Sequence, residues 1–163
     1  MALKKCTAFL LKADYLIAMM TAKSTTLQLF VYGSLRSGFR NPAYQYLSNY
    51  FTLIGEAVVQ GKFYDKGDYP VAIPDNGDHY ITGELYAAKD EEGFDWAIAQ
   101  LDDYEGLNVE PDEKPWYTRE LVTVYKDGKP SSSWIYWYND SVEGMPEIEV
   151  GDIMKYILQQ NKP

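Results

Sequence analysis

The sequence predicts an α+β domain in which a mixed β-sheet curls or closes on itself, with about three helices around it. Short apolar or alternating segments bounded by Gly, Pro, Asn and Asp outnumber the segments with helical periodicity. The turn sequence DGKP at 127–130 joins two of these segments directly, which indicates an antiparallel hairpin. Helices dispersed among antiparallel strands are typical of the α+β class.

The expected strands are short and bounded by turn residues. Residues 27–32 (LQLFVY) are mostly apolar and end at a glycine, and residues 80–87 alternate well enough for a strand. Residues 51–64 are rich in β-formers, and Gly55 and Gly61 predict bends or bulges there. The remaining segments are the apolar patch 71–73, between the turn clusters DKGDYP and PDNGD, and the two arms of the hairpin, 117–125 and 133–138.

The three expected helices are recognised by their first residues and their periodicity. The dipeptide NP at 41–42 opens a short helix, with proline in its first turn. Residues 92–104 form the clearest helical pattern. Asp152 is a suitable N-cap for a last helix, 153–160.

Length, charge and cysteine content limit the functions to consider. A chain of 163 residues is long enough for one domain with a real core. The formal net charge of −9 argues against nucleic acid and against an anionic membrane surface as partners, since both draw on Lys and Arg. The single cysteine, Cys6, excludes an intrachain disulfide and a cysteine-based zinc site, and a reducing cytoplasm is the expected location.

The first 26 residues differ from the rest of the chain. Residues 7–21 are apolar enough to suggest a signal peptide, but Lys12 and Asp14 interrupt them, and the run is too short for a membrane span. We therefore expect residues 1–26 to be an N-terminal extension, helical or poorly ordered, and residues 27–163 to form a single domain.

Residues 30–38 (FVYGSLRSG) place two glycines and a serine at the end of a predicted strand. The spacing of Gly33 and Gly38 matches a phosphate-binding loop, but Phe39 and Arg40 stand where that motif needs Lys and Ser or Thr. A nucleophilic Ser34 would need a base, and the only histidine lies in a turn-rich segment; the G-x-S-x-G pattern is absent as well.

A third interpretation of this stretch needs fewer groups. Where a strand ends at a glycine, successive backbone amides leave the sheet and can converge on an anion. Gly33 permits close approach of a ligand to the backbone, and the Ser34 hydroxyl adds a donor. A plain strand-to-loop turn that uses glycine for its dihedral angles is the alternative.

Helical periodicity singles out one carboxylate. At about 100° per residue, Glu105 falls roughly 20° from Phe94, in the stripe that faces the core, whereas Asp102 and Asp103 point to solvent. Partial burial, the C-terminal helix dipole and the two aspartates should raise the pKa of Glu105, which suits a general acid–base. Alternatively the helix frays, leaving Glu105 in water or paired with Arg119.

Four segments in order resemble the γ-glutamylcyclotransferase superfamily and its AIG2-like members: VYGSL at 31–35, GELY at 83–86, LDDYEG at 101–106 and WYTRELVTV at 116–124. The resemblance covers about residues 27–140. It implies a small closed β-barrel flanked by helices. It also implies a reaction in which the α-amine of a γ-glutamyl group attacks its own γ-carbonyl, forming 5-oxoproline and releasing an amine or amino acid.

The resemblance also implies roles for individual residues. The family's acid/base is the glutamate of its LD-x-[aromatic]-E-G pattern, which is Glu105 here. Its YG-[ST]-L loop binds the glutamyl group through backbone amides, which corresponds to Tyr32, Gly33, Ser34 and Leu35. Tyr117 and Arg119 are candidates for substrate contact, although packing and surface pairing are their ordinary alternatives. No metal or cofactor is required.

Other functions remain open from the sequence. The same fold is compatible with a non-catalytic domain that binds a small molecule or a protein, and fold alone does not decide between them. A third alternative is an enzyme that removes a γ-glutamyl cap from a biosynthetic intermediate. The acidic loop LNVEPDEKP favours leaving groups with an amine over acidic peptides if it borders the site.

Overall fold

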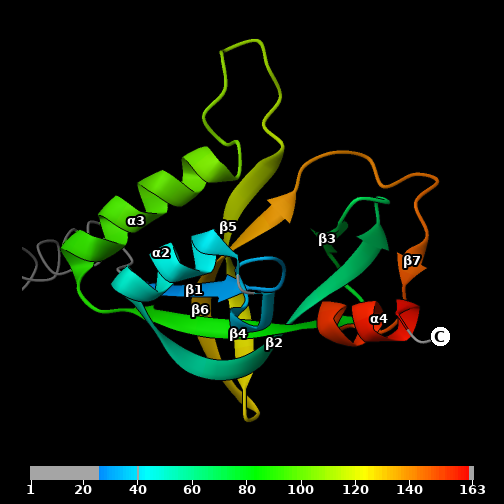
Figure 1. The fold of residues 1–163 in the computed structure, drawn as a ribbon, viewed down its shortest axis with the longest axis horizontal. Coiled ribbons are helices and arrows are strands. Elements are labelled where there is room, and N and C mark those ends of the chain that lie inside the picture. The colour runs from blue at the N-terminus through cyan, green and yellow to red at the C-terminus, as the bar shows by residue number, and fades with distance from the viewer. Residues whose placement is uncertain (1–25, 40, 162–163) are drawn as a thin grey trace, which may run out of the picture.

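The structure, a computed structural model, describes residues 26–39 and 41–161. The predicted extension, residues 1–26, lies outside the described residues except for Thr26. Five strands close into a barrel: β1 (Gln28–Val31), β2 (Phe51–Asp65), β4 (Tyr80–Ala88), β5 (Tyr117–Lys126) and β6 (Lys129–Tyr138). Their order is β2-β4-β1-β6-β5, and β2 pairs with β5 to complete the ring. The predicted α+β fold with a closed mixed sheet is confirmed (Figure 1).

Pairing directions follow from the connections between strands. The hairpin β5–β6 is antiparallel through its whole length, as the DGKP turn predicts. Strand β1 lies antiparallel to β4 and parallel to β6, so it is the element that makes the sheet mixed. Two short strands, β3 (Pro70–Pro74) and β7 (Glu147–Ile148), pair with the far end of β2.

Strand β2 has 15 residues and serves two parts of the sheet. Its pairing with β4 shifts register between Leu53 and Gly55, where Gly55 has a φ of +142°. From Gly61 onward the partner of β2 is β3. The two glycines predicted to bend this segment therefore mark its register shift and its change of partner.

Within the described residues, three α-helices and one short 3-10 turn surround the barrel. The 3-10 turn η1 (Ser37–Phe39) precedes α2 (Pro42–Tyr50), and α3 (Glu91–Tyr104) and α4 (Ile153–Gln160) follow later in the chain. Each α-helix begins at an acidic or amide N-cap whose side-chain oxygen accepts a backbone N–H; the caps are Asn41, Asp90 and Asp152. None of the helices in the described part of the chain is long and apolar enough to cross a bilayer.

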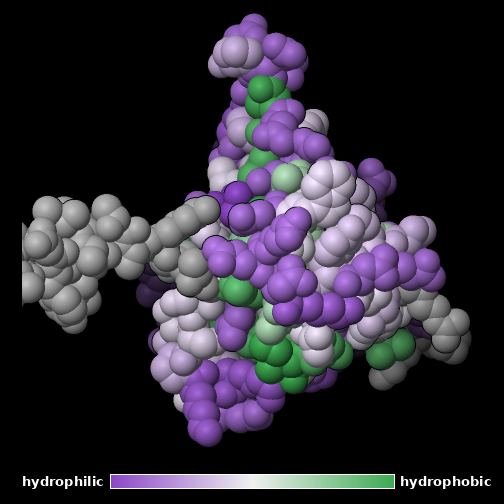
Figure 2. All heavy atoms as spheres, turned by 90° about the vertical axis from the view of Figure 1, so that its left-hand side faces the viewer, coloured by the Kyte–Doolittle hydropathy of each residue, from purple (hydrophilic) through white to green (hydrophobic). Residues whose placement is uncertain are grey.

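The core has two parts, and β1 belongs to both. Phe30 and Tyr32 face the barrel interior, whereas Leu29 and Val31 face α2 and α3. This alternation is the period of two expected for a strand buried on both faces. The buried stripe of α3 is the predicted one: Phe94, Ala97, Ile98 and Leu101. The loop between α3 and β5 projects away from this body (Figures 1 and 2).

The closeness of β1 and β4 depends on a glycine. A Cβ at Gly83 would press against the carbonyl oxygen of Val31 and come within 2.6 Å of the Phe30 ring. We expect Gly83→Ala to lower the free energy of unfolding by about 2–3 kcal/mol, because the backbone of β1 must move. Urea denaturation measures the change. Gly33→Ala is the matched control, because a Cβ added there would have no atom within 4 Å apart from its chain neighbours. Equal losses in both variants would contradict the prediction.

Candidate active site

One end of the barrel opens into a cavity of about 630 Å³. This volume is in the range typical of small-molecule sites. Residues from three regions line the cavity. The first is the segment from Phe30 to Leu35, and the second is the end of α3 together with Tyr117 and Tyr136. The third is the β2–β3 turn together with η1 and α4. The cavity therefore joins segments that are far apart in the sequence.

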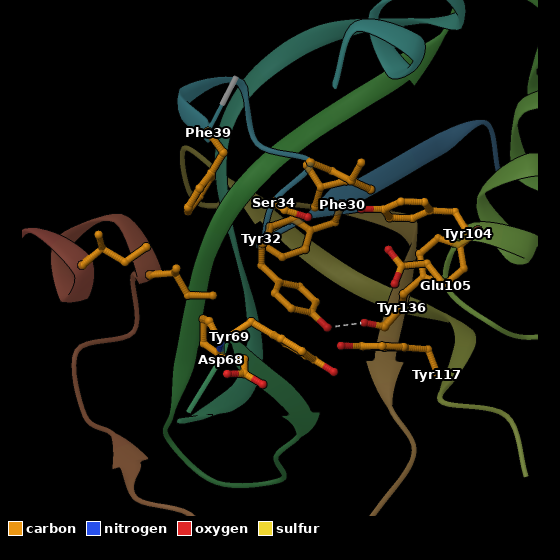
Figure 3. A pocket seen from close by; sticks show the side chains of 16 residues that line it. Phe30, Tyr32, Ser34, Phe39, Asp68, Tyr69, Tyr104, Glu105, Tyr117 and Tyr136 are labelled. Atoms are coloured by element: carbon orange, nitrogen blue, oxygen red, sulfur yellow. Dashed lines mark hydrogen bonds between the residues drawn. The ribbon is translucent and has the colours of Figure 1, made fainter. Parts of the chain in front are cut away.

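Glu105 enters this cavity from the end of α3. It is the C-cap residue, and its amide donates to the carbonyl of Leu101 at 2.8 Å, so helical hydrogen bonding reaches it. Figure 3 shows its carboxylate pointing into the cavity on the side of Tyr117 and Tyr136. The carboxylate has no hydrogen bond or ion pair with any residue that the structure describes, and burial raises its pKa to about 7.

The prediction that Asp102 faces solvent is wrong. Asp102 accepts two hydrogen bonds from Arg119, at 2.8 and 3.0 Å, and one from the Tyr136 hydroxyl at 2.7 Å. Strands β5 and β6 bring these partners against the helix, which periodicity within α3 cannot reveal. Asp103 is exposed. The raised pKa of Glu105 comes from burial and not from the two aspartates.

Three tyrosines surround Glu105. Burial is the first cause that raises the pKa of Tyr32, Tyr117 and Tyr136, and the charge of Glu105 raises each further. All three hydroxyls therefore remain protonated near neutral pH. The Tyr32 hydroxyl donates to the backbone carbonyl of Tyr136 at 2.6 Å (Figure 3). Asp102 holds the Tyr136 hydroxyl from outside the cavity.

The loop after β1 lines the same cavity, and three of its backbone amides have no acceptor among the described residues. The amide of Arg36 donates to the carbonyl of Gly33 at 3.0 Å and closes a turn. The amides of Gly33, Ser34 and Leu35 donate to no acceptor within residues 26–39 and 41–161. Neither packing nor a positive φ requires glycine at position 33, where a Cβ would project into open space.

Interactions with two acidic residues fix the position of this loop. The backbone amide and hydroxyl of Ser37 donate to Glu84 at 2.8 and 2.7 Å. Arg36 forms a buried ion pair with Asp152 at 2.9 Å. Both acidic partners lie far away in the sequence, so nothing in the local pattern of residues 30–38 indicated them.

The other residues that the sequence suggested for the site differ in whether they line the cavity. Tyr117 lines the cavity, whereas Arg119 lies outside it, with its guanidinium 4.7 Å from the Trp134 ring centre. His79 pairs with Asp75 at 3.0 Å in an exposed turn and does not line the cavity with Ser34. The acidic loop 107–115 contributes no lining residue either.

Several lining residues were not predicted from the sequence. These are Phe30, Val31, Phe39, Asp68, Tyr69, Pro70, Tyr104, Tyr136, Ile153 and Ile157. The high tyrosine content was one available signal, because tyrosine combines an apolar ring with a hydroxyl suited to a polar cavity. The described residues include no group of three or more His, Cys, Asp or Glu placed to hold a metal ion.

The raised pKa of Glu105 makes stability depend on pH. The pKa of Glu105 in the folded protein, about 7, lies above its value in the unfolded chain. The contribution of Glu105 to the free energy of unfolding is therefore fully present at low pH, and it is lost as the pH rises through 7. We therefore expect Glu105→Gln to raise the free energy of unfolding by about 2 kcal/mol at pH 8 and to leave it unchanged at pH 4. Chemical denaturation at both pH values checks this, with the exposed Glu110→Gln as control. Equal stability of parent and Glu105→Gln at pH 8 would contradict it.

Comparison with known proteins identifies the family. The family model described as gamma-glutamyl cyclotransferase, AIG2-like, matches residues 29–155, which extends past the sequence resemblance into α4. A gamma-glutamylcyclotransferase family protein of Escherichia coli K12 is 32% identical over 127 residues, covering 77% of this chain and 95% of that protein. A gamma-L-glutamyl-butirosin B gamma-glutamyl cyclotransferase of Niallia circulans is 28% identical over 132 residues, covering 80% and 78%.

Solved structures of two similar proteins share the fold of this chain. The solution structure of the protein ytfP of Escherichia coli superimposes with a TM-score of 0.53 at 28% identity, covering 80% of this chain and 98% of that one. The crystal structure of an AIG2-like protein of Mus musculus gives a TM-score of 0.53 at 22% identity, covering 76% and 86%, and shares the fold. The chain therefore belongs to the AIG2-like gamma-glutamyl cyclotransferase family.

Proposed function

We propose that this protein cyclises a γ-glutamyl group to 5-oxoproline and releases the attached amine or amino acid, with Glu105 as general acid–base. The observation that carries the proposal is the carboxylate of Glu105, which has no hydrogen bond or ion pair with a described residue and a pKa of about 7, in a cavity that residues 33–35 also line. Membership of the family supports the reaction class.

Glu105 is suited to move one proton in two directions. The α-ammonium of the substrate must lose a proton before its nitrogen can attack, and the Glu105 carboxylate accepts it. The nitrogen then forms a bond to the γ-carbonyl carbon, and the bond from this carbon to the leaving nitrogen breaks. Glu105 returns the proton to the departing amine. The ring nitrogen loses its second proton as it becomes an amide, and this proton also goes to the departing amine, which leaves as an ammonium ion. A pKa near the working pH serves both steps.

The loop after β1 is suited to hold the glutamyl group. Its three free amides, at Gly33, Ser34 and Leu35, are donors for a carboxylate or for the oxyanion that forms at the γ-carbonyl. Attack within one molecule is accelerated when the chain is held folded back on itself. The protonated hydroxyl of Tyr117 supplies a further donor on the Glu105 side of the cavity.

A direct assay tests the reaction. Purified protein is incubated with a panel of γ-glutamyl amines and γ-glutamyl dipeptides, and 5-oxoproline is measured by mass spectrometry. We expect product from at least one compound and a loss of at least about 100-fold in kcat for Glu105→Gln, because the amide cannot accept the proton.

The control separates chemistry from folding. Glu110→Gln, in the exposed loop after α3, should retain parental activity. Equal turnover by parent and Glu105→Gln would refute the role of Glu105. Binding of the compounds without product would favour the alternative of a non-catalytic binding domain.

Gly33→Ala tests the loop. The added methyl group would have no other protein atom within 4 Å, so we expect the free energy of unfolding to stay within about 1 kcal/mol of the parent. The same methyl group would meet a ligand bound at the loop amides, and we expect KM to rise by about tenfold or more. Steady-state kinetics with the best substrate measures this, and an unchanged KM would show that the loop does not contact the glutamyl group.

A further inference from the structure

The cavity is too large for a glutamyl group alone. A γ-glutamyl group has about nine non-hydrogen atoms, and even at the ~30 Å³ that a water molecule takes in the liquid they would need under ~300 Å³. The cavity measures about 630 Å³. Under the proposed function, the remaining space holds the leaving amine, and the walls of that space determine which amine fits.

The part of the cavity wall that η1 and α4 form is apolar, whereas the β2–β3 turn contributes Asp68 and Tyr69 to the lining. The apolar part includes Phe39 of η1 and Ile153 and Ile157 of α4. Figure 3 shows Phe39 and α4 across the cavity from Glu105. Phe39 and Ile157 are partly buried against the barrel core, so they present one side to the cavity while the other is packed. These side chains offer a ligand no hydrogen bond.

This apolar wall is fixed relative to the amide loop. Arg36, directly after Leu35, pairs with Asp152, directly before α4, and the two side chains are only 7% and 10% exposed. The same Asp152 oxygen accepts the Met154 amide at 2.9 Å and caps the helix. A Cβ on Gly38 would lie 2.8 Å from the Met154 side chain, so η1 and α4 are in close contact. The wall is therefore preorganised.

We propose that Phe39 and Ile157 form the leaving-group subsite, and that it selects γ-glutamyl amides whose amine carries an apolar aliphatic or aromatic body. The proposal rests on the proposed cyclisation. The amine body takes no part in the bond changes, so its burial against this wall contributes binding free energy that the enzyme uses to position the γ-carbonyl.

A chain-length series tests the subsite. The substrates are γ-glutamyl methylamide, butylamide and hexylamide, which differ only in methylene groups. We expect kcat/KM to rise about threefold per methylene as each is buried against the wall. Ile157→Ser should reduce the ratio of hexylamide to methylamide by about tenfold. Ile157→Ala gives the same reading if the serine variant folds poorly.

Leu158→Ser is the matched control. Leu158 follows Ile157 on the same helix but is 65% exposed and does not line the cavity, so the ratio should keep its parental value. A ratio near one in the parent, or equal loss in the Ile157 and Leu158 variants, overturns the proposal.

Binding separates this proposal from the proposed reaction. Calorimetry with the Glu105→Gln variant measures affinity for the three amides without turnover. Affinity that rises with chain length supports the subsite even if the parent forms no 5-oxoproline, an outcome that would refute the cyclisation alone. Turnover of all three amides at one rate, with equal affinities, refutes the subsite alone.

Discussion

The structure is organised around a carboxylate without a partner. Glu105 is held away from bulk water, and its charged form is disfavoured there because no described residue donates to it. Other contacts of α3 offset the free-energy cost of burying Glu105. The buried stripe of the helix packs on the barrel, and Asp102 in its last turn accepts hydrogen bonds from Arg119 of β5 and Tyr136 of β6. The helix end stays in place because its other contacts are strong.

Closure of the barrel brings the second half of the site to Glu105. Strand β1 is central, with β4 on one side and β6 on the other, and its last residues leave the sheet at the cavity. Because both neighbours fix the position of β1, the free amides of the following loop lie on a rigid support. Ser37, bonded to Glu84 of β4, extends this support past the loop.

The Arg36–Asp152 ion pair connects the loop after β1 to helix α4, and both of these elements line the cavity. One partner follows the amide loop, and the other caps the helix that supplies the apolar wall. A buried ion pair contributes little net stability when compared with apolar residues, but removing one partner is strongly destabilising. The pair therefore acts mainly to fix geometry, so that the polar and apolar parts of the cavity keep one relative position.

Short-range sequence patterns are sufficient to predict the local features of this protein. Strand segments, the hairpin, the caps Asn41 and Asp152 and the buried stripe of α3 depend on neighbouring residues, and periodicity and capping chemistry express them. The inward direction of Glu105 followed from the same periodicity. Contacts between distant residues became known only from the folded chain: the partners of Asp102, the pairing of β7 and the apolar wall of α4. These contacts join distant parts of the chain, and a local pattern contains no information on what lies across the cavity.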